Sequence, residues 1–188
     1  MMPDTTDQPP ARRADAARNR ERILQAARSA FADPETEVSM AAIARRSGVG
    51  SATLYRNFAS RRDLLEALYV DEVDAVCAAA STIDGESAGA RFTAWLHRFF
   101  QYFTSKRYVA AELLEHAEST SPVFGASRDR VLAAGAPLLR AAQDAGEVRS
   151  SLSLDQILDM IVAIAKIPGD PGYLEPILQT ALAGLANM

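Results

Sequence analysis

The sequence predicts an all-α protein of about nine helices, and three observations support this fold class. Apolar residues recur at spacings of three and four along most of the chain, as on the buried face of a helix. Serine precedes several of these runs and Gly or Pro follows them, as expected at helix ends. With 188 residues, 48% of them hydrophobic, the chain can bury a substantial core. We expect a tail over 1–15, a three-helix domain over 16–62 and a larger helical domain over 63–188.

The tail contains many Pro, Asp, Thr and Gln residues without periodicity, so we expect it to be disordered. The first helix is predicted from about Ala16 to Ala32, where Pro34 stops it. Its buried stripe consists of Ile23, Leu24, Ala27, Ala30 and Phe31.

Two short helices and a tight turn are predicted next. Ser39 can cap the first of them, and Gly48 stands where a left-handed residue would end it. The second helix can start at Ser51. Leu54 and Phe58 are four residues apart, so both point inward.

The opposite face of the second short helix is small, hydroxylated and basic. It carries Ala52 and Arg56, with Thr53 and Tyr55 on its flanks. Short side chains let a helix enter the major groove deeply, while Arg and hydroxyl groups reach bases and phosphates. The alternative is a helical hairpin such as any helical domain can contain.

The order and spacing of these residues resemble the N-terminal helix-turn-helix of the TetR family of bacterial repressors. The resemblance covers roughly residues 18 to 69 and is carried by Ala42-Ile43-Ala44, Gly48-Val49, Thr53-Leu54-Tyr55, Phe58 and Leu64-Leu65. It implies that the base-facing positions are Ser51, Ala52, Thr53 and Arg56. It implies that the phosphate contacts come from Ser39, Tyr55, Asn57 and Arg61. The chain departs from the family pattern at Ala41, where some members have a basic side chain that reads bases, so we expect little readout from this helix.

Charge is distributed unevenly along the chain. The net charge is −4. Between Ala11 and Arg62, however, eleven Arg and five acidic residues give +6, whereas residues 63–188 carry −8. A basic segment joined to an acidic one suits a protein that contacts phosphates with one part only. Chance clustering of Arg on a solvated face is the alternative.

Several classes of protein and site are disfavoured. The single cysteine, Cys77, argues against a disulfide framework and suits a reducing cytoplasm. No run of about 18 apolar residues indicates a membrane span, and the N-terminus lacks a secretory signal pattern. Two His and one Cys, far apart, predict no metal cluster. No nucleophile–base pair or Gly-rich phosphate loop supports an enzyme, and no cofactor is expected.

A long helix is predicted from Ser60 to about Ala80. Ser60 and Asp63 have the spacing of a capping box. The helix begins beside the helix-turn-helix and ends in the acidic domain, so we interpret it as a transmission element. A long core helix without a signalling role is the alternative.

The segment from about Ala90 to Thr104 is predicted as an aromatic helix, followed by a helix over about 108–119. Such a stripe can be core, but its size suggests space for an apolar guest. His116 can bind a polar group of that guest or pair with Glu112 on the surface. The candidate ligand-binding residues are Trp95, Phe99, Tyr102, Phe103, Leu113, His116 and Met160.

Three further helices are predicted over about 122–145, 154–167 and 173–186. Pro137 lies inside the first and predicts a kink or break. The last two can dock on a second copy as a four-helix bundle, as the family resemblance also implies. A hairpin buried within one chain is the alternative. The candidate interface residues are Ile157, Ile161, Ile164, Ile177, Leu178, Ala181, Leu182 and Leu185.

Together these features predict a dimeric, cytoplasmic, TetR-like transcriptional repressor. Its two recognition helices would read half-sites about one helical turn apart on a near-palindromic double-stranded operator. A small-molecule effector in the acidic domain would release it from DNA. The alternative is a DNA-binding regulator without a small-molecule ligand, which acts constitutively or under the control of a protein partner.

Overall fold

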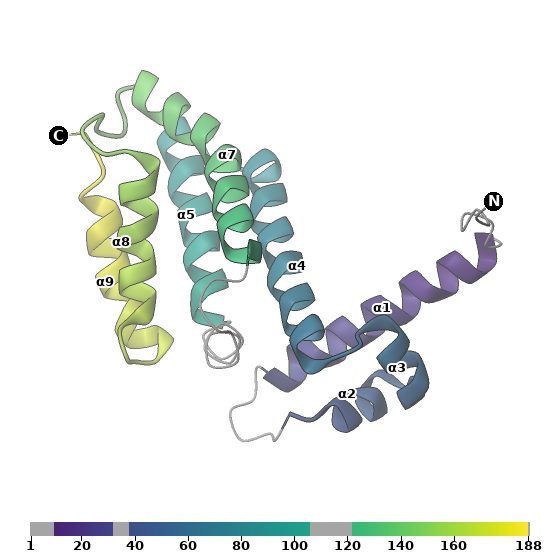
Figure 1. The fold of residues 1–188 in the computed structure, drawn as a ribbon. Coiled ribbons are helices and arrows are strands. Elements are labelled where there is room, and N and C mark those ends of the chain that lie inside the picture. The colour runs from purple at the N-terminus through teal and green to yellow at the C-terminus, as the bar shows by residue number, and fades with distance from the viewer. Residues whose placement is uncertain (1–9, 32–37, 106–121, 188) are drawn as a thin grey trace. The chain divides into compact units, whose positions relative to one another are not determined.

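The computed structural model of the protein describes residues 10–31, 38–105 and 122–187, which form eight α-helices and no strand beyond an isolated bridge (Figure 1). The helices are α1 Pro10–Phe31, α2 Met40–Ser47, α3 Ser51–Asn57, α4 Arg61–Thr82, α5 Ala88–Ser105, α7 Pro122–Asp144, α8 Leu154–Lys166 and α9 Pro171–Ala183. The all-α prediction is confirmed. The chain divides into two compact units, Met1–Leu68 and Tyr69–Met188, so the boundary falls inside α4.

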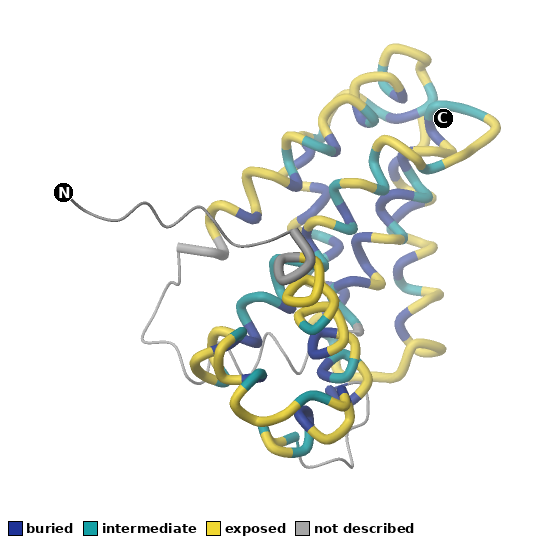
Figure 2. Tube along the Cα trace, turned by 90° about the vertical axis from the view of Figure 1, so that its right-hand side faces the viewer, coloured by how far each residue is buried: buried dark blue, intermediate teal, exposed yellow. Residues whose placement is uncertain are grey.

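In the first unit, α1 packs against both α2 and α3. The predicted stripe of α1 is buried, and Ile43, Leu54 and Phe58 are at most 2% exposed (Figure 2). This burial against α1 stabilises both short helices, because helices of eight and seven residues are marginal in isolation.

Local hydrogen bonds define both ends of α2. The Ser39 hydroxyl accepts from the Ala42 amide at 3.2 Å. Gly48 has φ 64°, and its amide donates to the carbonyls of Ala44 and Arg45. Because only glycine adopts this conformation without strain, Gly48 sets the turn that leads into α3.

The capping box predicted for α4 is present. The Ser60 amide donates to the Asp63 carboxylate at 2.9 Å, and the Asp63 amide donates to the Ser60 hydroxyl at 3.1 Å. A second capping box, between Ser153 and Gln156, starts α8.

In the second unit, α5 packs against α7 and α8, and α8 packs against α9. The only tryptophan of the chain, Trp95, is fully buried, and its indole donates to the Val76 carbonyl of α4 at 3.1 Å. Gly135 of α7 provides the space for this ring, because a Cβ there would lie 2.2 Å from it.

Three features of the helices differ from prediction. α1 begins at Pro10 rather than near Ala16, because Pro suits a first turn and the Ala- and Arg-rich segment that follows favours a helix. α7 continues through Pro137 without interruption, so of the predicted kink or break, the break is absent. α9 ends at Ala183 rather than Ala186. The helix expected over 108–119 lies outside the described residues.

Candidate DNA-binding surface and ligand pocket

The predicted base-facing side of α3 lies on the surface of the first unit. Tyr55 is 51% exposed and Arg56 is also exposed, whereas Leu54, between Thr53 and Tyr55, is fully buried. Ser51 and Ala52 are exposed, and Thr53 and Asn57 are half-buried. The outward face of α3 therefore combines one exposed aromatic ring and one arginine with short polar side chains.

Two polar side chains of this face bind their own helix. Arg56 donates through Nη2 to the Thr53 hydroxyl at 3.1 Å and through Nε to the Ala52 carbonyl at 3.3 Å. The side-chain amide of Asn57 donates to the backbone carbonyl of Thr53 at 2.8 Å. These bonds hold Arg56 and Asn57 along α3.

Arg61 has a different environment from the rest of the predicted set. Its guanidinium donates to the Val38 carbonyl and lies 5.2 Å from the centre of the Phe31 ring. Arg61 therefore joins the start of α4 to the end of α1 and the segment before α2. Ser39, predicted to contact phosphate, uses its hydroxyl to cap α2.

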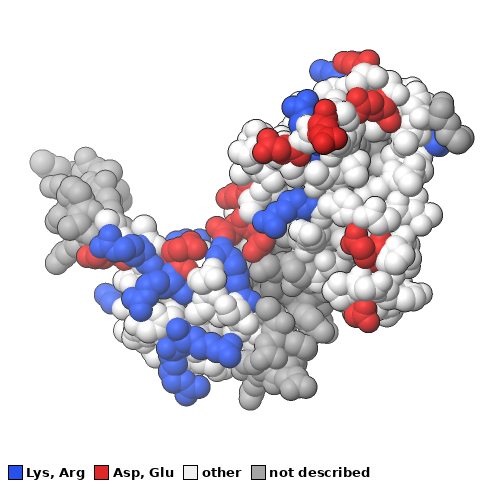
Figure 3. Space-filling view, turned by 180° about the vertical axis from the view of Figure 1, so that it is seen from behind, with Lys and Arg blue, Asp and Glu red and all other residues white. Residues whose placement is uncertain are grey.

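Several arginine side chains gather on the face of the first unit that Figure 3 shows. Among its described side chains, nine Arg accompany four acidic residues. The arginines are Arg18, Arg20, Arg22, Arg28, Arg45, Arg46, Arg56, Arg61 and Arg62. Two of them cover the helix-turn-helix directly: Arg20 lies over the Phe58 ring at 4.6 Å, and Arg22 donates to the Gly48 carbonyl at 3.4 Å. Arginine side chains of α1 therefore lie directly on residues of the helix-turn-helix.

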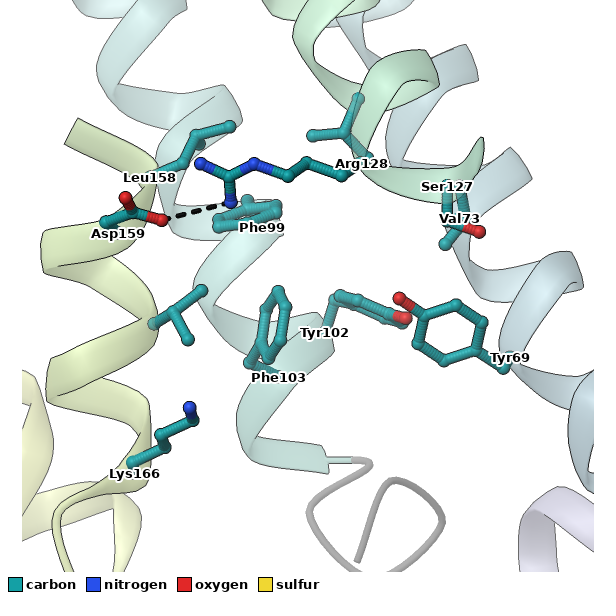
Figure 4. A pocket seen from close by; sticks show the side chains of 12 residues that line it. Tyr69, Val73, Phe99, Tyr102, Phe103, Ser127, Arg128, Leu158, Asp159 and Lys166 are labelled. Carbon is teal, nitrogen blue, oxygen red and sulfur yellow. Dashed lines mark ion pairs between the residues drawn. The ribbon is translucent and has the colours of Figure 1, made fainter. Parts of the chain in front are cut away.

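A cavity of about 300 Å³ lies in the second unit, among α4, α5, α7 and α8 (Figure 4). Its apolar lining consists of Val73, Phe99, Phe103, Val131, Leu158 and Val162. Its polar lining consists of Tyr69, Tyr102, Ser127, Arg128, Asp159 and Lys166.

The two tyrosines bring their hydroxyl groups together at one side of the cavity (Figure 4). Their ring centres are 6.0 Å apart. Burial raises the pKa of both phenols, and the interaction between them raises the pKa of Tyr102 further. Both are therefore protonated at neutral pH and can donate a hydrogen bond.

An ion-pair cluster crosses from α7 to α8 beside the cavity. Arg128 contacts Asp155 at 2.9 Å and Asp159 at 3.0 Å. The hydrogen bond to Asp159 is the largest of the effects that raise the pKa of Arg128.

Comparisons with known proteins match both units to the same kind of protein. The family model of the tetR family of bacterial regulatory proteins matches residues 23–68. The model of the C-terminal domain of SbtR-like transcriptional regulators matches residues 87–187, which is more than half of the chain. The chain belongs to the TetR family of transcriptional regulators.

Solved structures of other TetR regulators are similar over nearly the whole chain. A TetR transcriptional regulator from Streptomyces coelicolor is 34% identical, with a TM-score of 0.75 over 90% of this chain and 99% of the other. A TetR transcription regulatory protein from Mycobacterium vanbaalenii is 29% identical, with a TM-score of 0.74 over 93% and 98%. The comparison with curated proteins gave no match. Members of the family are transcriptional regulators and not enzymes. Among the described residues of this TetR regulator, no helix has the length and apolar character needed to cross a membrane.

The pocket of this TetR regulator includes three of the predicted ligand-binding residues: Phe99, Tyr102 and Phe103. Trp95 lies outside the lining, stacked behind Phe99 at 6.1 Å. Met160 also lies outside it and packs against the core. Leu113 and His116 are outside the described residues.

Sequence reasoning did not identify the residues of α4, α7 and α8 that line the pocket. Each of these helices supplies positions four residues apart: Tyr69 and Val73, Ser127 and Val131, Leu158 and Val162. That spacing marks a helix face in the sequence. It does not identify which faces meet.

The predicted dimer residues of this TetR regulator lie mainly in its own core. Leu178 is fully buried, and the others with at most 7% exposure are Ile157, Ile161, Ile164, Leu182 and Leu185. Only Ile177 and Ala181 are partly exposed. The buried side chains fill the core of their own chain, whereas Ile177 and Ala181 are accessible to a second copy.

Proposed function

We propose that this TetR regulator is a homodimeric, cytoplasmic repressor that binds a near-palindromic operator through α3 and leaves it when a small molecule occupies the pocket of the second unit. The observation that carries the DNA-binding part is the outward face of α3, which is exposed, short-chained and basic behind a turn set by Gly48.

The DNA contacts that we propose for the residues of α3 follow from the chemistry and the exposure of their side chains. Arg56 can bind guanine in the major groove with two hydrogen bonds, and the short side chains of Ser51 and Ala52 allow close approach. The hydroxyl of Tyr55 and the amide of Asn57 suit phosphate contacts, which position the helix without reading sequence. In this proposal Arg56 exchanges its bond to Thr53 for bonds to a base.

The dimer surface in this proposal is the exposed side of α8 and α9. Met160 and Ile177 are partly exposed, and Tyr173 is 59% exposed. Ala163 and Gly184 are small and exposed, so helices of a second copy can approach closely. Two-fold docking of this surface would present two copies of α3 to successive half-sites about one helical turn apart.

α4 supplies the connection between ligand and DNA. Its first residue, Arg61, contacts Phe31 and Val38, and its ninth, Tyr69, lines the pocket. Tyr69 follows Arg61 by eight positions in the same helix. A ligand that moves Tyr69 therefore acts on the helix that Arg61 joins to the helix-turn-helix. To release DNA it must bind the released state more tightly, by about 3 kcal/mol for a 150-fold change in affinity.

The test is selection of genomic fragments by the purified full-length protein, followed by footprinting. We expect protected half-sites with approximate two-fold symmetry. Ala52→Glu places a carboxylate on the exposed tip of α3 and should abolish binding, whereas Ala133→Glu adds the same charge at an exposed position of α7 and should not. Equal binding by both variants would contradict the assignment of α3.

A further inference from the structure

The pocket is an apolar slot that continues the aromatic core of α5. Phe92, Trp95, Phe99 and Phe103 form an unbroken series of ring contacts, with centres 4.9 to 6.3 Å apart. The series begins in the fully buried core and ends at the cavity wall, where Phe99 and Phe103 face open space (Figure 4). A flat apolar group can extend this stack, which rings favour at such separations.

The size of the cavity limits the guest. An apolar cavity of about 150 Å³ holds a benzene molecule. The pocket measures about 300 Å³. It therefore accommodates one or two rings with short substituents and excludes large polycyclic compounds.

Hydrogen-bonding groups lie at one side of the slot. Tyr69 and Tyr102 present hydroxyl groups there, and Ser127, which is 3% exposed, adds a third (Figure 4). Hydroxyl groups both donate and accept, so they suit a hydroxyl or carbonyl oxygen on the guest.

The charged residues of the lining lie at the other side of the slot (Figure 4). Arg128 is held by two carboxylates, Asp155 and Asp159, which offset its charge. Lys166 lies apart from this pair, farther along α8, and points toward the slot beyond Phe103 (Figure 4). No carboxylate of the described residues pairs with Lys166. Its ammonium is the lining charge best placed to accept a ligand anion.

We propose that the effector is a small aromatic acid, with its rings on Phe99 and Phe103, an oxygen at the Tyr69–Tyr102 side and its carboxylate at Lys166. This inference rests on the proposed function of the pocket and specifies its ligand class. The ammonium of Lys166 attracts an anionic guest, repels a cationic one and gains nothing from a neutral one.

Isothermal titration calorimetry of the full-length protein tests the class with three probes of one shape. The probes are 6-hydroxynaphthalene-2-carboxylate, its neutral primary amide and the cationic 6-(aminomethyl)naphthalen-2-ol. We expect the carboxylate to bind at least about tenfold more tightly than the other two, as a hydrogen bond to a charged group implies. Equal or tighter binding of the amide or the amine, or no binding of any probe, would overturn the proposal.

Two substitutions locate the ends of the ligand. Lys166→Gln should weaken carboxylate binding about tenfold and leave the amide unchanged. Arg140→Gln removes the same charge from an exposed position of α7 outside the lining and serves as the control. Tyr102→Phe should weaken the hydroxy acid but not naphthalene-2-carboxylate, which lacks the hydroxyl group. An unchanged carboxylate affinity in Lys166→Gln would reject the assignment of the anion site.

DNA binding by the same preparations separates this inference from the proposed function. Normal footprints without binding of any probe would reject the ligand class and leave the DNA-binding role in place. Binding of the carboxylate without any footprint would reject the DNA-binding role and leave the ligand class in place.

Discussion

The Nη2 atom of Arg56 lies 3.1 Å from the hydroxyl of Thr53, one turn earlier on α3. Two side chains of the same outward face therefore bind each other, and the Ala52 carbonyl accepts a further bond from Arg56 at 3.3 Å. The guanidinium is held along the helix rather than extended. If the guanidinium binds a base, its bonds to that base must replace these contacts. The net gain in binding free energy is then smaller than for an arginine that is already extended.

Arg56→Ala should weaken operator binding by about 1–3 kcal/mol and relax the preference at one base pair of each half-site. Arg56→Lys retains the charge but not the planar fork, so it should not restore that preference. Affinities for a set of singly substituted operators measure both effects. A uniform loss across all operators, fully recovered in Arg56→Lys, would mean that Arg56 contacts phosphate instead.

The parts of the structure that were predicted well are those that depend on neighbouring residues. The caps at Ser39 and Ser60 and the left-handed Gly48 each depend on groups within a few positions of the chain. The burial of Leu54 and Phe58 follows from their spacing on one helix.

The parts that were missed depend on contacts between distant residues. The contacts of Arg61 with Phe31 and Val38, for example, could not be predicted from the residues next to it in the sequence. In the same way, the apolar residues of α8 and α9 were assigned to a dimer interface, and most of them are buried in the core of their own unit. A single helix pattern marks an apolar face without identifying what covers it.

Two glycines of α7 should respond in opposite directions to alanine. In Gly135→Ala the new Cβ would lie 2.2 Å from the ring of Trp95, which its indole hydrogen bond and stacking on Phe99 hold in place. We expect a loss of about 1–3 kcal/mol in the free energy of unfolding and a change in tryptophan emission. Gly125→Ala meets no atom within 4 Å and should stabilise the helix by about 0.5–1 kcal/mol. Denaturant unfolding measures both, and equal stability of the two variants would contradict the packing of Trp95 against α7.

Glu147 should make stability depend on pH in the acid range. Its carboxylate accepts from the Ser87 hydroxyl and, at 2.7 Å, from the Gly89 amide at the start of α5, and these bonds lower its pKa. A carboxylate whose pKa is lower in the folded than in the unfolded protein contributes its full stabilisation at pH values above the unfolded-state pKa. That stabilisation is lost as the pH falls through the folded-state pKa. Glu147→Gln should therefore reduce Tm at neutral pH, and its difference from the parent should shrink below about pH 4. Glu86→Gln removes a nearby exposed carboxylate as the control, and a difference that stays constant with pH would exclude this linkage.

Ile177 and Leu178 are adjacent on α9 but face different environments, so the pair separates dimerisation from folding. Leu178 is fully buried in its own chain, whereas Ile177 is partly exposed. If the exposed side of α8 and α9 joins two copies, Ile177→Glu should give folded monomers in sedimentation experiments, since it places charges across a two-fold interface. Leu178→Ala should instead lower the free energy of unfolding by about 2–5 kcal/mol through a cavity, without a folded monomer at native conditions. Folded dimers of Ile177→Glu at low micromolar concentration would place the interface elsewhere.

Because two half-sites require two linked recognition helices, the Ile177→Glu monomer should also lose most of its operator affinity while retaining the circular dichroism of the parent.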